Sequence, residues 1–313
     1  MAQATSIPMT NSLTSYKSIL LATDFSAASQ AAFQTALAVS SALHATLLIV
    51  HVFDYANSAP PESGGQRLEL DSVFESARSS LDWLIQEARR SGVSCAATMG
   101  SGIPSVTIRE TITSQAIDLV VLGTNALHGF ERLVFGSTAE AVLRKAPCPV
   151  LTVGPQAQHA TNAGQLYGPV VFATDFHPTT SCAIRDAAIF CEATRSPLHC
   201  LHVLPRVLEH GGSSHIIPQI MTEALQTLAI ESGTTVDPPV CAITYGSEIS
   251  NMVVEYAKKQ KARLIVLGVR RAPMMASHIT AHLAYRIITE APCPVLTVAF
   301  HSRLPATLAA ACL

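Results

Sequence analysis

The motif Ala22-Thr23-Asp24-Phe25 occurs a second time as Ala173-Thr174-Asp175-Phe176, and the octapeptide Ala146-Pro-Cys-Pro-Val-Leu-Thr-Val153 returns unchanged at residues 291–298. Such a long repeat indicates two complete domains of one kind rather than a solenoid of short units. We expect a first repeat at 16–154 and a second at 169–300. A linker at 155–168 joins them, and flexible tails occupy 1–15 and 301–313.

The composition is that of a globular chain with large cores. Of its 313 residues, 49% are hydrophobic and only 13% are charged, and the formal net charge is −2. A near-neutral chain without a run of lysine and arginine lacks the basic footprint that nucleic-acid binding needs. The longest apolar runs, such as 45–52, fall far short of the roughly 18 residues of a membrane span. Because the N-terminal stretch does not resemble a signal peptide, we expect a cytoplasmic protein with no membrane or nucleic-acid partner.

The cysteines and histidines predict neither a disulfide framework nor a metal site. The eight cysteines are scattered without a Cys-x-x-Cys pair, so we expect reduced thiols. Cys148 and Cys293 lie at equivalent places and are expected to pack. The densest cluster, His199-Cys200-Leu201-His202, lies on an expected strand, where side chains alternate between faces. His199 and His202 therefore point to opposite faces and are expected to be structural.

Apolar strands alternate with amphipathic helices along both repeats, which predicts parallel sheets covered on both faces. In the first repeat we expect strands at Ser18–Ala22, Ala45–Val52, Val93–Met99, Asp118–Leu122 and Pro149–Val153. The expected helices are Ala27–Leu43, Leu68–Arg90, Pro104–Ser114 and one starting near Gly136, with a loop at Asp54–Gly65. In the second repeat we expect strands near Val170–Ala173, Leu198–Val203, Val240–Thr244, Leu264–Leu267 and Val295–Val298. Each repeat is thus an α/β, doubly wound domain with a five-stranded parallel sheet.

Ligands of such sheets bind beyond the carboxyl ends of the strands. In the first repeat, Asp24 follows the first strand, Val52 ends the second, and a glycine-bounded segment at 123–138 leads from the fourth strand into a helix. Glycines and a helix N-terminus can hold phosphate groups through backbone N–H donors. A purely structural interpretation also exists, in which Asp24 caps the helix starting at Ser26 and Ser137 caps the last helix with Glu140.

These motifs, in this order and in both copies, resemble the universal stress protein family over nearly the whole chain. The resemblance implies the adenine nucleotide α-hydrolase-like fold. Its nucleotide-binding members carry Gly-x2-Gly-x9-Gly-(Ser/Thr), and this chain has Gly123, Ala126, Gly136 and Ser137 at those positions. By resemblance, Asp24 and the backbone of Val52 hold adenosine, and the glycine-rich segment holds ribose and phosphates. The implied ligand is ATP or another adenine nucleotide, with Mg as an accompanying ion. The implied nucleotide-binding residues are Ala22, Thr23, Asp24, Val52, Gly123, Asn125, Ala126, Gly136, Ser137 and Thr138.

The second repeat departs from that motif. Its residues at the four positions are Gly268, Arg271, Ala281 and His282, so only the first glycine remains. We expect this repeat to have lost the triphosphate site and to act as a structural or regulatory partner. Arg270 and Arg271 are either a smaller anion site or an ordinary surface pair.

No nucleophile elbow, P-loop or metal-ligand spacing is present, so we expect no enzyme and at most slow ATP hydrolysis. The leading hypothesis is a stress-response signalling or regulatory protein that binds nucleotide in its first repeat and is read by protein partners. The alternatives are a nucleotide-independent scaffold and, less favoured, an adenylate-forming or sulfur-transfer enzyme. The family resemblance also implies a pseudo-dimer in which Val150–Val153 pairs antiparallel with Val295–Val298. Further association into a homodimer stays open.

Overall fold

The computed structural model describes residues 15–54, 64–124, 136–160, 168–209, 216–270 and 278–299. The strands of the first repeat are β1 (Ser18–Thr23), β2 (Thr46–Phe53), β3 (Cys95–Ser101), β4 (Leu119–Gly123) and β5 (Val150–Val153). Its helices are α1 (Ala27–Leu43), α2 (Gly64–Arg90), α3 (Pro104–Ser114) and α4 (Ser137–Lys145), and α5 (Pro155–Ala160) follows β5. The strands of the second repeat are β6 (Val170–Ala173), β7 (Leu198–Leu204), β8 (Val240–Tyr245), β9 (Leu264–Val269) and β10 (Val295–Ala299). Its helices are α6 (Pro178–Ser181), α7 (Ile184–Thr194), α8 (Ile216–Ser232), α9 (Ile249–Gln260) and α10 (His278–Glu290), with a short 3-10 turn at Arg206–Leu208.

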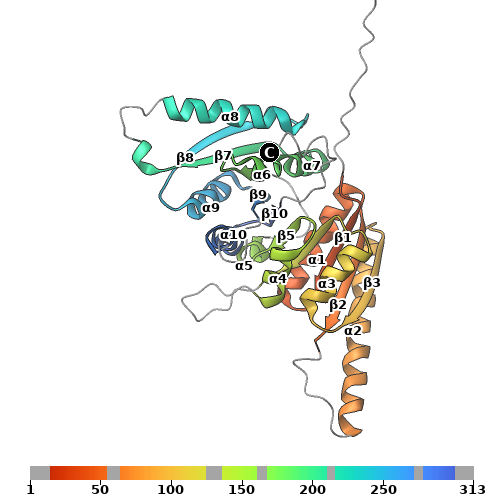
Figure 1. Ribbon diagram of the computed structural model, residues 1–313. Coiled ribbons are helices and arrows are strands. Elements are labelled where there is room, and N and C mark those ends of the chain that lie inside the picture. Colours follow the sequence, from red (N-terminus) through yellow and green to blue (C-terminus); the bar gives the residue numbers. More distant parts are fainter. Residues whose placement is uncertain are drawn as a thin grey trace, which may run out of the picture.

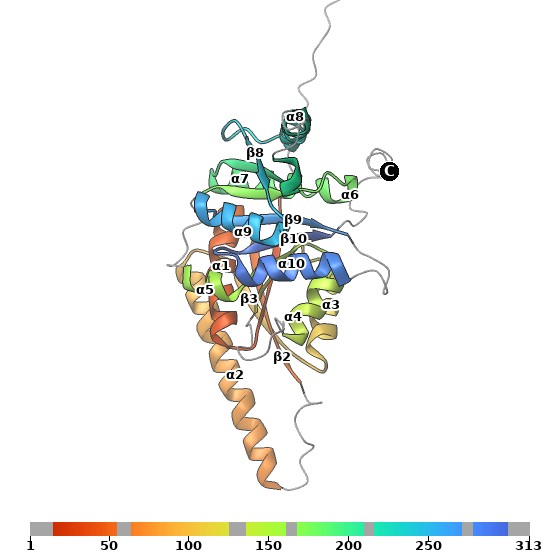
Figure 2. The ribbon, with the colours of Figure 1, turned by 90° about the vertical axis from the view of Figure 1, so that its left-hand side faces the viewer.

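The ten strands form one sheet in the order β3-β2-β1-β4-β5-β10-β9-β6-β7-β8. Each repeat contributes five parallel strands, and the order of the second repeat mirrors that of the first. Figures 1 and 2 show the two halves on either side of β5 and β10, with α2 projecting beyond the sheet. The expected α/β doubly wound fold is confirmed for both repeats.

The two repeats join through their fifth strands. β5 and β10 pair antiparallel, with Leu151 opposite Leu296 at the centre of the register. The Thr297 hydroxyl donates to the carbonyl oxygen of Val150 at 3.2 Å, and both residues are buried. Pairing satisfies backbone groups that two sheet edges would leave open. The expected antiparallel pairing of these strands is confirmed.

Helices cover both faces of the sheet, and the two hydrophobic cores continue across the junction. One core lies beneath α1, α2, α5, α7 and α8, and the other beneath α3, α4, α9 and α10. Successive residues of β1 alternate between them, since Ile19 and Leu21 belong to the first core and Leu20 to the second. Each core contains residues of both repeats, so neither repeat has a core closed to the other.

Several expected boundaries differ from the observed ones by one to four residues, and three of the starting residues differ for identifiable reasons. Strand β3 begins at Cys95 rather than Val93, because the Val93 amide closes the end of α2 on the carbonyl oxygen of Ala88, with Gly92 in the left-handed conformation (φ 76°). Strand β4 begins at Leu119, because the Asp118 carboxylate accepts backbone N–H groups at the start of β1.

Helix α2 begins at Gly64, four residues before the expected start, and so includes the last part of the expected loop. The strong helix formers that follow extend it, and glycine costs little in a first turn. The rest of that loop, residues 55–63, lies outside the described residues. The expected linker likewise contains the short helix α5.

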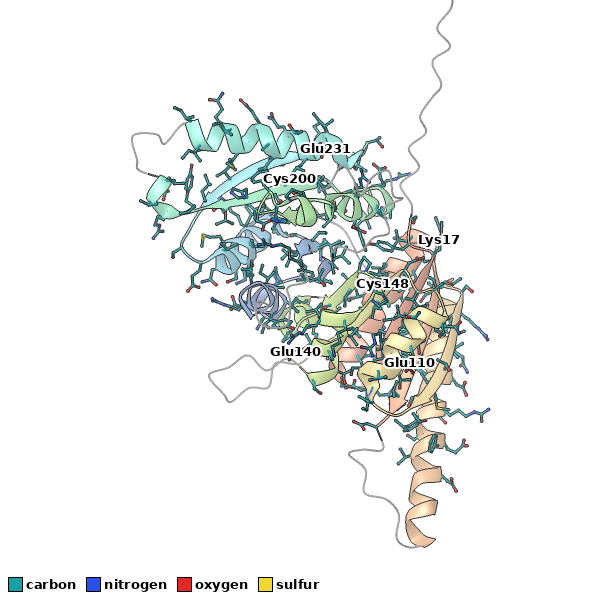
Figure 3. All side chains as sticks on the ribbon, in the orientation of Figure 1. Lys17, Glu110, Glu140, Cys148, Cys200 and Glu231 are labelled. Carbon is teal, nitrogen blue, oxygen red and sulfur yellow. The ribbon has the colours of Figure 1, made fainter. Side chains whose placement is uncertain are left out.

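The seven cysteines within the described part of the chain are free thiols, as expected. Cys148 and Cys293 are both buried and pack in the same core. Figure 3 shows Cys148 and Cys200 within the two halves of the molecule. His199 lies 3.1 Å from the Tyr256 hydroxyl and His202 lies 2.8 Å from the Thr174 carbonyl oxygen, so each histidine has its own protein partner. Over the described residues, no helix is both long and apolar enough to cross a bilayer.

Candidate functional site

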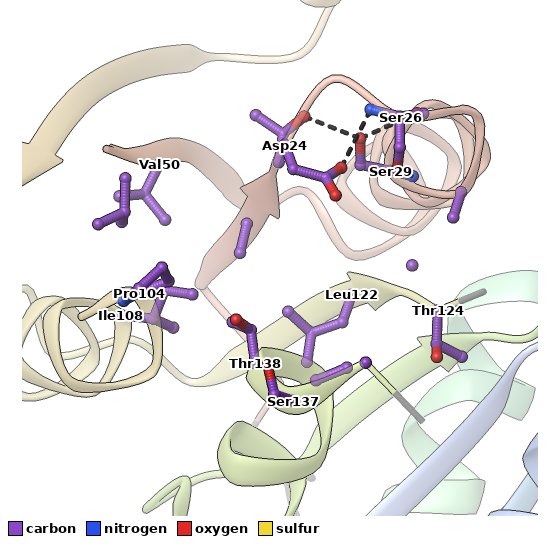
Figure 4. A pocket seen from close by; sticks show the side chains of 17 residues that line it. Asp24, Ser26, Ser29, Val50, Pro104, Ile108, Leu122, Thr124, Ser137 and Thr138 are labelled. Carbon is purple, nitrogen blue, oxygen red and sulfur yellow. Dashed lines mark hydrogen bonds between the residues drawn. The ribbon is translucent and has the colours of Figure 1, made fainter. Parts of the chain in front are cut away.

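A cavity of about 360 Å³ lies at the carboxyl ends of β1, β2 and β4. Figure 4 shows Asp24, Ser26 and Ser29 on one side of it and Ser137 and Thr138, at the start of α4, on the other. The cavity lies where the strand order of the first repeat reverses, the place at which open α/β sheets bind ligands.

The turn between β1 and α1 is fixed by side chains. The Thr23 hydroxyl accepts from the Phe25 amide at 3.1 Å and donates to the Ser29 hydroxyl at 3.1 Å. Phe25 has a left-handed backbone (φ 63°), which a residue with a side chain adopts only when its surroundings hold it there. Ser26 is the N-cap of α1 and accepts from the Ser29 amide. The expectation that Asp24 caps this helix is therefore wrong.

Asp24 instead accepts the Ser26 amide through Oδ1 at 3.0 Å. Partial burial by itself would raise the pKa of the Asp24 carboxyl, but hydrogen bonds from Ser26 and Ser29 outweigh it and hold that pKa below its ordinary 3.8. Asp24 is thus an ionised acceptor at neutral pH. It suits the N–H or O–H donors of a base or a sugar.

The N-terminus of α4 faces the cavity without a side-chain cap. Gly136 is the N-cap residue, and Ser137 is the first residue of the helix. The expected capping by Ser137 and Glu140 is wrong, because Glu140 pairs with Arg144 at 3.4 Å instead. The first amides of any helix lack intrahelical acceptors, and they carry the positive end of the helix dipole. The first turn of α4 therefore offers N–H donors to an anion in the cavity.

The two glycines of the predicted motif do different things. A Cβ at Gly123 would lie 2.2 Å from the carbonyl oxygen of Ala28, so this glycine lets the backbone of α1 approach β4. A Cβ at Gly136 would meet nothing within 4 Å. Gly123 is thus required by packing within the protein, whereas Gly136 leaves open space beside the α4 amides.

Thr124 is a residue that sequence reasoning missed. Its side chain is 4% exposed and lines the cavity, and its hydroxyl has no hydrogen-bond partner among the described residues. The hydroxyl oxygen itself is buried, so Thr124 lines the cavity through its other atoms. Its place next to Gly123 in a strand-end loop was the available signal. Other lining residues missed by the sequence are Ser26, Ala28, Ser29, Val50, Pro104, Ile108, Leu122 and Ala139.

The cavity brings together most residues of the predicted site. Its lining includes Ala22, Thr23, Asp24, Val52, Gly123, Gly136, Ser137 and Thr138. Asn125 and Ala126 lie outside the described residues, as does most of the glycine-bounded segment. That these side chains bind a nucleotide stays a prediction.

The second repeat keeps the turn after its first strand, where Thr174 accepts from the Phe176 amide and Asp175 from the His177 amide, but differs in two other features. Asp175 holds the position of Asp24 but pairs with Arg270 at 3.5 Å. Helix α10 starts at His278, a full turn before the position that corresponds to Ser137, so its backbone is already helical at Ala281 and His282. Arg271 lies outside the described residues.

Comparison with known proteins identifies this doubly wound pair of repeats. The model of the universal stress protein family matches residues 15–154 and again residues 166–299. The chain belongs to the universal stress protein family.

Individual relatives agree with the duplication. Universal stress protein MJ0531 of Methanocaldococcus jannaschii is 32% identical over 139 residues, which are 44% of this chain and 82% of the relative. Universal stress protein A homolog 1 of Coxiella burnetii is 34% identical over 144 residues, 44% of this chain and 96% of the relative. A solved universal stress protein from Archaeoglobus fulgidus matches both repeats, with a TM-score of 0.69 at 20% identity over 91% of this chain and 98% of that one. The similarity to this solved structure supports the fold alone.

Proposed function

We propose that the cavity of the first repeat binds ATP or a related adenine nucleotide, with the phosphates at the N-terminus of α4. The observation that carries the proposal is the first turn of α4, which faces the cavity and has no side-chain cap. The ionised Asp24 supplies an acceptor for the nucleoside. A cavity of about 360 Å³ lies within the usual range for small-molecule sites.

The output of this site is binding rather than turnover. Asp24 is the charged residue among the described residues that line the cavity, and no lysine or arginine joins it there. Phosphoryl transfer needs positive charge to offset the charge that develops on the phosphate. A Mg²⁺ ion bound with the nucleotide would supply such charge, but an aligned base and nucleophile would still be needed for fast hydrolysis. The protein then acts as a cytoplasmic stress-response regulator whose nucleotide state is read by partner proteins.

Calorimetric titration of the full chain with ATP tests the proposal. We expect one site per chain, and we expect native mass spectrometry of gently purified protein to show a co-purifying adenine nucleotide. If millimolar ATP produced no heat and the native mass showed no nucleotide, the proposal would fail and the nucleotide-independent scaffold would be favoured. If an adenylylated product were trapped, the result would instead favour the hypothesis of an adenylate-forming enzyme.

A further inference from the structure

The second repeat has a cavity of its own at the carboxyl ends of β6, β7 and β9, which point opposite to those of the first repeat because β5 and β10 pair antiparallel. Its volume is about 530 Å³, larger than that of the first repeat. The walls come from β7, β9, α9 and α10 and are mainly aliphatic, which suits a ligand with an apolar body. The aliphatic wall residues are Leu201, Val203, Ile249, Val253, Leu267, Val269, Leu283, Ala284 and Ile287.

The amides of α4 that face the first cavity have no counterpart in α10. Because α10 starts at His278, the amides at residues 282–284 lie one turn inside the helix. At that depth they donate to carbonyl groups of the preceding turn. The amides of α10 are therefore not available to an anion, although the first turn of α9, which lines the cavity at Ile249 and Ser250, has no side-chain cap.

Two arginines line the cavity and differ in how firmly they are held. Arg286 contacts the carboxylate of Glu248 at 3.0 Å and the amide oxygen of Asn251 at 3.2 Å, and Glu290 lies 3.9 Å away. The guanidinium of Arg270 makes one contact among the described residues, at 3.5 Å to Asp175. Both side chains of that pair are about half exposed, so the pair is weak. A guanidinium has five N–H donors, so Arg270 has donors to spare.

We propose that this cavity binds a medium-chain monocarboxylate, with the alkyl chain along the aliphatic wall and the carboxylate on Arg270. A planar carboxylate matches the guanidinium fork. The charged residues that line the cavity are two arginines, Asp175 and Glu248, whose formal charges cancel. A monocarboxylate brings a single negative charge beside the two fixed carboxylates, whereas a triphosphate would bring several. This site is independent of the nucleotide site proposed above.

The test is calorimetric titration of octanoate into the full chain, with and without ATP, and of 1-octanol as the uncharged analogue. We expect one octanoate per chain, with an affinity that ATP does not change and at least tenfold above that for octanol. Arg270→Gln should weaken octanoate binding at least tenfold. Arg185→Gln, an exposed arginine on α7 outside the cavity lining, should leave it unchanged.

Hydrogen exchange of the wild-type chain supplies a readout that needs no variant. Octanoate should protect amides in β9 and α10 rather than those in β4 and α4. The proposal is overturned by no octanoate binding, by equal affinity for octanol, by an Arg270→Gln variant that binds normally, or by competition between ATP and octanoate.

Discussion

The ring nitrogen Nδ1 of His51 lies 2.9 Å from the carbonyl oxygen of Thr23, and this contact is duplicated: Nδ1 of His202 lies 2.8 Å from the carbonyl oxygen of Thr174. Because a carbonyl only accepts, each Nδ1 carries a proton. Phe25, two residues after Thr23, packs against His51 with ring centroids 4.5 Å apart. A histidine on the neighbouring strand thus holds the turn in which the acidic residue of each repeat lies.

Replacing His51 with leucine should remove the contact that positions Asp24. We expect a stability loss of about 1 kcal/mol, the usual worth of one such hydrogen bond, together with weaker ATP binding. His202→Leu is the matched control and should cost similar stability while ATP binding is unchanged. Urea unfolding and calorimetry measure the two effects. Equal losses of ATP affinity in both variants would contradict the positioning role of His51.

Replacing Gly123 or Gly136 with alanine distinguishes a role in packing of the fold from a role in nucleotide binding. Gly123→Ala should destabilise the fold by about 1–3 kcal/mol, because its Cβ would collide with the backbone of α1. Gly136→Ala should change stability by less than about 1 kcal/mol, since its φ of −57° suits alanine and the space around it is open. The added methyl should nevertheless lower ATP affinity, because it occupies space beside the α4 amides. Normal ATP binding by a folded Gly136→Ala variant would place the phosphates elsewhere.

The lowered pKa of Asp24 makes part of the stability depend on pH. A carboxyl with a lower pKa in the folded than in the unfolded chain stabilises the fold above its ordinary pKa, and this contribution is lost as pH falls through the folded value. Asp24→Asn should therefore be less stable than wild type at neutral pH, and the difference should shrink below the ordinary value of 3.8. Urea midpoints across this range measure it. The control is Asp71→Asn, which changes an exposed aspartate on α2. If the stability difference between Asp24→Asn and wild type were constant with pH, the lowered pKa of Asp24 would be refuted.

The duplicated motifs predicted the fold because they lie at the ends of strands, where the backbone conformation restricts which residues can occur. Apolar runs fixed the strands, and the family resemblance implied the β5 and β10 pair. Boundaries failed where a side chain or a cap competes with the strand, as at Asp118 and Val93. Such contacts depend on partners remote in sequence, which periodicity does not reveal.

The candidate site was predictable in outline but not in its details. The motif placed Asp24 and Gly136 at one cavity, yet it did not reveal that Gly123 serves packing against α1. For the second repeat, loss of the phosphate motif was interpreted as loss of the triphosphate site, with a smaller anion site at Arg270 and Arg271 left open, and the aliphatic cavity was not predicted. A longer α10 and the Arg270–Asp175 pair change the chemistry of that end of the sheet while the cavity remains.

The junction between the repeats should make unfolding a single event. Leu151 and Leu296 are 1% and 0% exposed and lie opposite each other, and both cores contain residues of both repeats. Leu296→Ala should cost about 2–5 kcal/mol, as expected for a large truncation in a packed core. Trp83, the single tryptophan, lies on α2 of the first repeat and so reports unfolding there.

We expect the fluorescence transition of Trp83 to move to lower urea in the Leu296→Ala variant, in step with hydrogen exchange of α9 in the second repeat. Val298→Ala, on the same strand but only partly buried, should move both transitions less. If α9 lost protection while the Trp83 transition stayed in place, the repeats would unfold independently. In that case the continuous sheet would connect two separate folding units.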